Sequence, residues 1–225
     1  ELGCPREKVQ VQHLGVEVSE FPHRARSWTV GDPLRLLAAG RFTEKKGFPD
    51  AIRAFARFLS QGGKGHLTIV GGRRNEEKDR TGRRELRRIA RQCGVEEQVH
   101  LRGFLSHSEL IEAYCNHHLL LSPSVEASDG DNEGGAPVTL IEASATGLPI
   151  VSTQHCDIPN VVRDGETGLL AEEGDTETLA SHLSTIYKNP KWVADLAEAA
   201  RNHIETEYNA RVQGQRLDEI YKSLY

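Results

Sequence analysis

Short apolar runs alternate along the chain with longer segments of mixed polarity. Continuous apolar runs of this length are typical of strands buried on both faces of a parallel sheet. The runs that predict strands are 34–39 (LRLLAA), 66–70 (HLTIV), 99–101 (VHL), 119–122 (LLLS) and 149–153 (PIVST), and a turn over 163–170 leads into one more. The segments that predict helices are 50–59, 73–91, 106–114, 137–146, 175–189, 192–205 and 211–224. This order predicts an α/β fold, a doubly wound, Rossmann-like parallel sheet with its ligand outside the carboxyl ends of the strands.

The first part of the chain has a different character. Residues 9–14 (VQVQHL) alternate with a period of two, which predicts a short strand. Residues 21–32 are polar and irregular, as expected of a linker. The chain contains no methionine, so we expect it to be a piece of a longer protein.

A glycine loop, a short helix and a buried strand are predicted in turn for residues 131–153 (DNEGGAPVTLIEASATGLPIVST). Pro137 suits the first helical turn, and Gly147 suits the position just past the last one. The helix carries one charge, Glu142, so we expect it to be buried on most sides and Glu142 to have a partner. Its first amides follow Glu133, which predicts an anion site with a carboxylate at the rim. A ligand with both phosphates and hydroxyls, such as a nucleotide sugar, suits this site.

A basic glycine loop joins the first strand of the predicted sheet to its helix. It reads GRFTEKKG at 40–47 and places Arg41 and Lys46 at the carboxyl end of a parallel strand. Fixed cations there suit a departing diphosphate, because arginine grips phosphate with a planar fork and lysine adds a point charge. Lys45 is the weaker candidate, and a solvated basic turn is the alternative interpretation.

Both motifs resemble retaining glycosyltransferases of family 4, which have the GT-B fold. The pattern G-R-x4-K-G is similar to that family's diphosphate-binding loop. The stretch from Glu133 to Thr153 is similar to its Glu-x7-Glu region, with eight rather than seven residues between Glu133 and Glu142. The resemblance implies the C-terminal half of a GT-B fold, in three parts. These are a remnant of the N-terminal domain with linker (1–31), a nucleotide-sugar donor-binding domain (32–206) and a closing helix (207–225).

The resemblance also implies roles for single residues. The implied catalytic residues are Arg41, Lys46 and Glu133, the cations holding the diphosphate and Glu133 contacting hydroxyls of the donor sugar. The implied donor-binding residues are Gly40, Leu105, Gly134, Gly135, Ala136 and Glu142. Among these, Leu105 meets the nucleotide base through its backbone, and Glu142 meets the ribose hydroxyls.

The reaction implied by the resemblance is transfer of a hexose with retention of anomeric configuration. The donor would be a nucleotide-diphosphate sugar such as UDP- or GDP-hexose, the acceptor a glycan or a lipid-linked glycan, and neither a metal nor another cofactor is expected. The loop SDGDNEG at 128–134 also resembles enzymes of the exopolysaccharide and colanic-acid type. Because the acceptor pocket of this fold lies on the N-terminal domain, we expect these 225 residues to fold but not to transfer sugar beyond slow donor hydrolysis.

Composition narrows the class of partners and the compartment. The formal net charge is −5, with 27% charged and 37% hydrophobic residues, which is an ordinary balance that does not favour nucleic acid. No apolar run approaches the roughly 18 residues of a membrane span and no signal peptide opens the chain. We therefore expect a cytoplasmic protein, with peripheral contact to the inner face of the membrane left open. The four cysteines are scattered and fit reduced structural thiols.

Some patterns leave alternatives open. Asp129 and Asp131 form a D-x-D triplet that suits a divalent metal, an acidic surface loop or contacts with the acceptor. The arginine-rich stretch 73–91 suits a solvated helix or one that binds an anionic surface, and His155 suits a loop residue or a catalytic base. No G-x-G-x-x-G follows the first strand, which disfavours a dinucleotide reductase. A nucleotide-sugar binding module without turnover and a sugar-nucleotide epimerase remain alternative functions.

Overall fold

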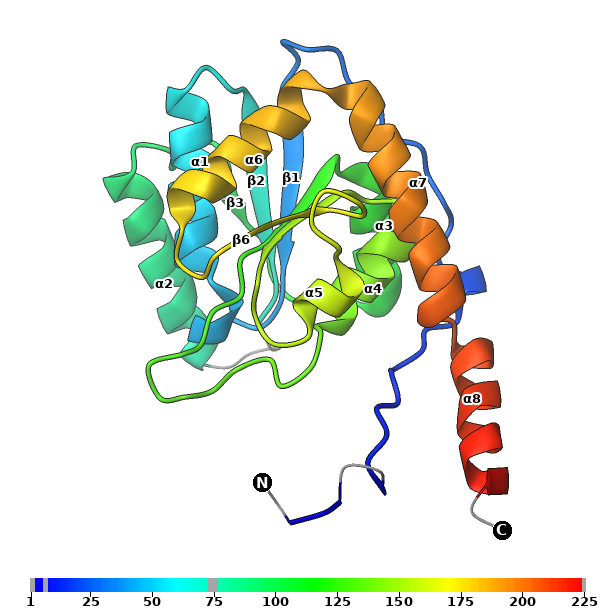
Figure 1. Ribbon diagram of the computed structural model, residues 1–225. Coiled ribbons are helices and arrows are strands. Elements are labelled where there is room, and N and C mark those ends of the chain that lie inside the picture. The colour runs from blue at the N-terminus through cyan, green and yellow to red at the C-terminus, as the bar shows by residue number, and fades with distance from the viewer. Residues whose placement is uncertain (1–2, 6–7, 73–76, 224–225) are drawn as a thin grey trace.

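The computed structural model describes residues 3–5, 8–72 and 77–223. Within these residues, six parallel strands form one sheet in the order β3-β2-β1-β4-β5-β6 (Figure 1). The strands are β1 (Leu34–Ala39), β2 (Gly65–Val70), β3 (Val99–Leu101), β4 (Leu119–Ser122), β5 (Ile150–Thr153) and β6 (Leu169–Ala171). The order changes direction between β1 and β4, which confirms the predicted doubly wound, Rossmann-like α/β fold and places its switch point between these two strands.

Helices cover both faces of the sheet. One face carries α1 (Phe48–Ser60), α2 (Glu77–Gln92) and α6 (Thr176–Lys188). The other carries α3 (His107–Asn116), α4 (Val138–Ala145), the single turn α5 (Ile158–Val161) and the C-terminal part of α7 (Pro190–Glu207). The last helix, α8 (Ala210–Ser223), extends past the sheet beside the N-terminal segment (Figure 1). Each helical segment predicted from the sequence is present with bounds shifted by a few residues, and residues 73–76 of the arginine-rich stretch lie outside the described part.

The strands are mostly apolar because most of their residues face one of two cores, while Arg35, His66 and His100 are exposed. In β1, Leu36 and Ala38 pack under α1, while Leu37 and Ala39 pack toward α4, and Leu36, Leu37 and Ala38 are fully buried. Burying one leucine side chain stabilises a fold by about 1.5 to 3 kcal/mol. Because both faces are used, the strands show continuous runs instead of polar–apolar alternation.

The predicted strand at 9–14 is wrong. Its apolar residues are solvent-exposed, with Val11 78% exposed, and the described residues provide no strand beside it. The segment instead contacts helix α8, where Gln12 Nε2 donates to Gln213 Oε1 at 2.6 Å. Alternation alone does not make a strand, because a strand also needs a neighbour to accept its backbone hydrogen bonds.

The parallel arrangement brings all the carboxyl ends of the strands to one edge, which lies at the bottom of Figure 1. The loops that follow β1 and β4 lie there, and the N-terminal segment and α8 project past the same edge. Among the described helices, none combines the length and the apolar character that crossing a bilayer requires.

Candidate functional site

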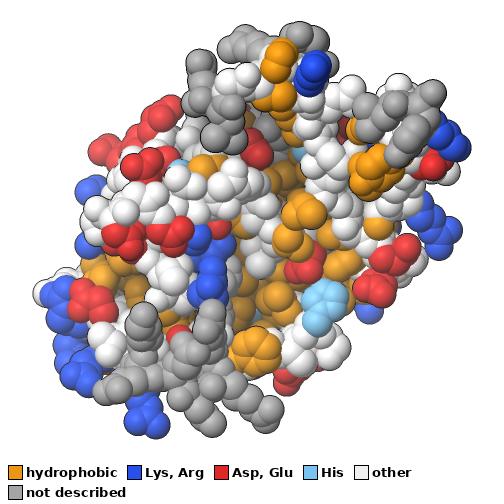
Figure 2. All heavy atoms as spheres, turned by 90° about the horizontal axis from the view of Figure 1, so that it is seen from below, with side chains coloured by type: hydrophobic (Ala, Val, Ile, Leu, Met, Phe, Trp, Pro, Cys, Tyr) orange, Lys and Arg blue, Asp and Glu red, His pale blue; other side chains and the backbone are white. Residues whose placement is uncertain are grey.

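The loops after β1 and β4 contact each other at the carboxyl edge, as the neighbouring positions of the two strands require. The amide of Val125 donates to the carbonyl of Lys45 at 3.0 Å. A Cβ on Gly47 would approach the carbonyl oxygen of Pro123 to 1.7 Å, and the φ of Gly47 is +59°, so this contact requires glycine. Figure 2 shows this face, where apolar side chains lie in a central hollow with basic and acidic side chains around it. The two predicted motifs therefore share one surface.

An ion pair joins the two motifs. Lys46 Nζ lies 2.9 Å from Glu133 Oε1 and 3.0 Å from Glu133 Oε2. The Ser124 hydroxyl donates to the same carboxylate at 2.9 Å. The side chains of Lys46 and Glu133 are only 13% and 6% exposed, so each charge depends on the other for compensation. Two of the three predicted catalytic residues are thus in direct contact.

Arg41, the third, is exposed, and its positive charge contributes to lowering the pKa of Asp131. Among the described residues, none forms a hydrogen bond or ion pair with its guanidinium, which is therefore available to an anion. Gly40, next to it, has a φ of +156°, and a Cβ there would meet the stem of Lys46 at 3.1 Å. Glycine at this position therefore allows the lysine to lie flat against the loop and reach Glu133.

The helix α4 begins directly after Gly134, Gly135 and Ala136. Pro137 is its N-cap, with ψ of 129°, and not a residue of its first turn as predicted. The carbonyl of Pro137 starts the helix by accepting from the amide of Leu140 at 2.9 Å. The amides of Val138 and Thr139 have no backbone acceptor among the described residues, so the positive end of the helix is open at the edge of the sheet.

The D-x-D triplet is engaged by one contact from the loop after β1 and by one within its own loop. Lys45 Nζ lies 2.8 Å from Asp131 Oδ1 and donates to the carbonyl of Asn132 at 2.7 Å. The hydrogen bond from Lys45, with added positive charge from Arg41, lowers the pKa of Asp131. Asp129 accepts from the amide of Asp131 at 3.0 Å. No three His, Cys, Asp or Glu side chains of the described residues come together as metal ligands, and the expectation that no metal is needed stays a prediction.

Glu142 is buried in α4 and has two partners, which confirms the prediction that its charge requires one. Its Oε2 accepts from the Tyr114 hydroxyl at 3.0 Å, and its Oε1 lies 3.2 Å from His107 Nε2. Burial and then the charge of Glu142 raise the pKa of Tyr114 well above its ordinary value, so this hydroxyl stays a donor. Both partners lie on α3, which the local sequence around Glu142 does not reveal.

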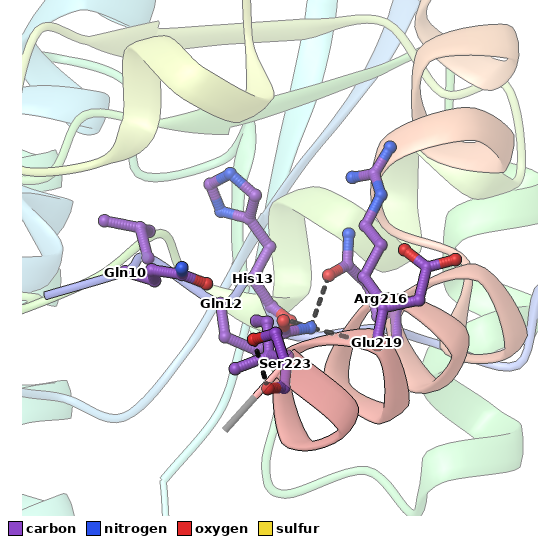
Figure 3. Close-up of a pocket in the computed structure, with 9 residues that line it drawn as sticks. Gln10, Gln12, His13, Arg216, Glu219 and Ser223 are labelled. Carbon is purple, nitrogen blue, oxygen red and sulfur yellow. Dashed lines mark hydrogen bonds between the residues drawn. The ribbon is translucent and has the colours of Figure 1, made fainter. Parts of the chain in front are cut away.

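Leu105 lies just before α3 and packs, partly buried, against the same core as α4. With Arg102 and Glu109 it lines a groove of about 320 Å³ on that side of the sheet. A separate pocket of about 340 Å³ lies between the N-terminal segment and α8, lined by Gln12, Arg216 and seven other residues (Figure 3). The predicted site residues, all within the described part, do not line this second pocket.

Two further residues, His155 and Glu173, reach the site, of which the sequence left His155 open between a loop residue and a catalytic base and did not indicate Glu173. His155 is 3% exposed, and its Nε2 lies 3.2 Å from the amide nitrogen of Glu133. Its Nδ1 lies 2.6 Å from Glu173 Oε1. The position of His155 two residues after a predicted strand, and so at the carboxyl edge, was the available signal. Its contact with Glu133 depends on the packing of β5 beside β4.

Comparison with known proteins identifies the family of the chain. A family model described as Glycosyl transferases group 1 matches residues 21–203. The amylovoran biosynthesis glycosyltransferase AmsK of Erwinia amylovora is 36% identical over 223 residues, which are 99% of this chain and 53% of AmsK. The putative colanic acid biosynthesis glycosyltransferase WcaL of Escherichia coli (strain K12) is 34% identical over 224 residues, again 99% of this chain and 53% of the relative. The chain thus spans about half the length of these curated relatives.

Solved structures share the fold at lower sequence identity. The crystal structure of Anabaena Alr3699/HepE in complex with UDP superposes with a TM-score of 0.83 at 20% identity, over 98% of this chain and 59% of that one. A sucrose-phosphate synthase from Thermosynechococcus elongatus superposes with a TM-score of 0.78 at 23% identity, over 94% of this chain and 51% of that one. The fold is that of GT-B glycosyltransferases over about half of their length.

Proposed function

The chain belongs to the glycosyl transferases group 1 family, and we propose that it is the donor-binding half of a retaining glycosyltransferase. The observation that carries the proposal is the Lys46–Glu133 ion pair, because it brings a cation suited to the diphosphate beside a carboxylate suited to the sugar. In a nucleotide sugar the diphosphate and the sugar are adjacent, because the diphosphate is bonded to the anomeric carbon of the sugar.

The diphosphate would bind between Arg41, Lys46 and the open end of α4. Negative charge grows on the departing diphosphate as the glycosidic bond breaks, and fixed cations and amides stabilise such charge in the transition state. Arg41 is free to form a forked contact, and Lys46 would exchange its carboxylate partner for a phosphate oxygen. This arrangement needs no metal ion, which is part of the proposal.

The two glutamates would divide the rest of the donor between them. Once Lys46 turns to the diphosphate, Glu133 has acceptor oxygens for sugar hydroxyls, while Ser124 keeps its carboxylate in place. Glu142 would accept from the ribose hydroxyls. Its carboxylate is already oriented by Tyr114 and His107, so little side-chain freedom is lost on binding.

The acceptor would be a glycan or a lipid-linked glycan held by the part of the protein that these residues do not include. The names of AmsK and WcaL refer to the biosynthesis of amylovoran and colanic acid, and a role in making a polysaccharide is proposed by analogy. Location in the cytoplasm, with peripheral contact to the inner face of the membrane, is part of the same proposal. On this basis the 225 residues alone bind donor but do not transfer sugar.

Calorimetry tests donor binding directly. The chain is titrated with UDP, GDP and ADP, each with and without EDTA, and binding of at least one nucleotide that survives chelation is expected. Arg41→Ala should weaken that binding by about 1.5 to 3 kcal/mol, as for a charged hydrogen bond. Arg91→Ala, an exposed arginine paired with Glu96 at the end of α2, serves as the matched control and should change nothing. Loss of all binding on chelation would contradict the metal-free site and favour Asp129 and Asp131 as ligands.

Transfer is tested with the longer protein that carries this chain, radiolabelled donor and candidate glycan or lipid-linked acceptors. Acceptor-dependent product with the donor's anomeric configuration is expected. Conversion of the donor to its epimer without an acceptor would support an epimerase instead, and binding without any turnover would support a binding module.

A further inference from the structure

A buried histidine supports the backbone of Glu133 from behind. His155 Nε2 lies 3.2 Å from the Glu133 amide nitrogen. A backbone N–H is always a donor, so Nε2 must be unprotonated to accept from it. On the other side of the ring, Nδ1 lies 2.6 Å from Glu173 Oε1, and a carboxylate can only accept. Both contacts are satisfied by one state of His155, the neutral ring with its proton on Nδ1.

Glu173 holds the same loop at a second point. Its other oxygen, Oε2, accepts from the amide of Glu126 at 2.8 Å. Glu126 and Glu133 both belong to the loop that follows β4, so Glu173 fixes one end of this loop directly and the other end through His155. The Glu133 side chain leaves the loop toward Lys46, on the surface where the two motifs meet.

We propose that His155 and Glu173 are positioning residues that orient Glu133 toward a hydroxyl of the donor hexose. They act through the loop backbone and do not touch the ligand. The inference rests on the proposed function, because it takes Glu133 to be the sugar contact. It predicts that both residues matter for binding a nucleotide sugar and not for binding the nucleoside diphosphate alone. The cations proposed to bind the diphosphate, Arg41 and Lys46, belong to the loop after β1.

The groups that face His155 determine what a second proton on its ring would do to the contact with Glu133. They are the carboxylate of Glu173 after β6, the Cys156 thiol with Sγ 3.2 Å from Nε2, and the loop at Glu133, whose carboxylate is neutralised by Lys46. A proton added to Nε2 would face the Glu133 N–H, so two donors would oppose each other. The loop would then lose its support at Glu133 while Glu173 kept its contact with the ring.

Glu173→Gln changes the hydrogen-bonding groups at this position without changing the size of the side chain. A carboxylate offers two acceptors to His155 Nδ1–H and the Glu126 amide, whereas a glutamine amide offers one acceptor and one donor. If the amide group donates to Nδ1, the His155 proton moves to Nε2 and opposes the Glu133 N–H. If it faces Glu126 instead, that end of the loop is released. Glu173→Gln is therefore expected to disturb the orientation of Glu133 whichever way the glutamine amide group faces.

The affinity for a nucleotide sugar relative to its nucleoside diphosphate is the quantity to measure. The chain is titrated by calorimetry with UDP, UDP-glucose, GDP and GDP-mannose at pH 8. Glu173→Gln and His155→Ala should each lower the affinity for the nucleotide sugar by about 3- to 10-fold, the loss of one neutral hydrogen bond, and leave the nucleoside diphosphate within about 2-fold. Equal losses for both ligands, or no loss for either, would overturn the proposal.

Three matched variants separate positioning from general stability. His155→Gln keeps an acceptor for the Glu133 amide and should retain most of the affinity. Cys156→Ala removes the other neighbour of Nε2 and should have no effect. His203→Gln changes another buried histidine, bonded to the Asn160 carbonyl at 2.8 Å, and should lower thermal stability without altering the ratio of affinities. A loss in His203→Gln like that in Glu173→Gln would assign the effect to stability.

Nuclear magnetic resonance of histidine labelled with ¹⁵N tests the geometry without a ligand. His155 should carry its proton on Nδ1 at pH 8, and a proton on Nε2 would overturn the proposal whatever the binding results. If the unsubstituted protein binds none of the four ligands, the proposed function fails. If it binds them and the Glu173→Gln ratio is unchanged, only the positioning role fails.

Discussion

The Lys46–Glu133 pair predicts opposite effects on nucleotide binding for the removal of its two charges. Glu133→Gln should strengthen the binding of UDP or GDP, and Lys46→Met should weaken it. In the unliganded protein the carboxylate occupies the ammonium group that the diphosphate needs, at 2.9 Å, and adds a negative charge beside it. Removing that carboxylate frees the cation, whereas removing the lysine leaves a 6% exposed carboxylate without its partner.

The magnitude follows from the distance and the burial. Two unit charges 2.9 Å apart attract by about 6 kcal/mol at an effective dielectric constant of about 20. Desolvation offsets most of this attraction, and about 1 to 2 kcal/mol is a reasonable net value for a pair with limited access to water. Glu133→Gln should therefore tighten UDP or GDP binding by about 5- to 30-fold. Lys46→Met removes a charged hydrogen bond to phosphate and should weaken binding by about 10- to 150-fold.

Calorimetry at pH 7.5 on both single variants and the double variant measures the coupling between the two residues. Glu205→Gln, which removes an exposed carboxylate paired with Arg201 on α7, is the control and should leave the affinity unchanged. The reasoning would be refuted if Glu133→Gln weakened UDP and GDP binding in the same direction as Lys46→Met. That outcome would mean that Glu133 contributes to the nucleotide site directly and does not compete for its cation.

Three further predictions follow from other contacts. Glu142→Ala should weaken UDP and UDP-sugar alike, by about 1.5 to 3 kcal/mol in calorimetry, since both contain the ribose; a loss confined to the sugar nucleotide would contradict its assignment. Arg26→Ala should lower the free energy of unfolding in urea by about 2 to 4 kcal/mol, because its buried guanidinium donates to backbone carbonyls in α3 and at the end of α4; the exposed Arg24→Ala is its control. Burial lowers the pKa of His118 to about 4, so the unfolded chain takes up the proton first. The free energy of unfolding therefore decreases by up to about 3 kcal/mol as the pH falls from about 6.5 to 4. His118→Asn should reduce this pH dependence, measured by urea unfolding at a series of pH values.

The order of strands and helices could be read from the sequence because it depends on local patterns. The run at 34–39 is apolar at every position except Arg35, as expected of a strand covered on both faces, and the single charge in 137–146 marks a helix buried on most sides. The failure at 9–14 has the same origin. Its alternation is a local property, but a strand exists only where a neighbour accepts its hydrogen bonds, and the described residues place none there.

The candidate site was predictable as two separate motifs and not as one arrangement. Glycines and basic residues at 40–47, and a carboxylate before a buried helix at 133–142, indicate phosphate and hydroxyl chemistry through residue type alone. Their direct contact through Lys46 and Glu133 depends on β1 lying beside β4, which is a property of the whole sheet. Tyr114 as the partner of Glu142 likewise depends on how α3 packs near α4.

The support behind Glu133 shows most clearly what only the tertiary structure decided. His155 and Glu173 follow different strands, and nothing in the sequence indicates that the two residues meet. They meet because β5 and β6 are adjacent, and they reach Glu133 because β5 also lies beside β4. The sequence determines the chemical type of each side chain. The short distances that let a carboxylate, an imidazole and an amide act together arise only when strands far apart in the sequence pair.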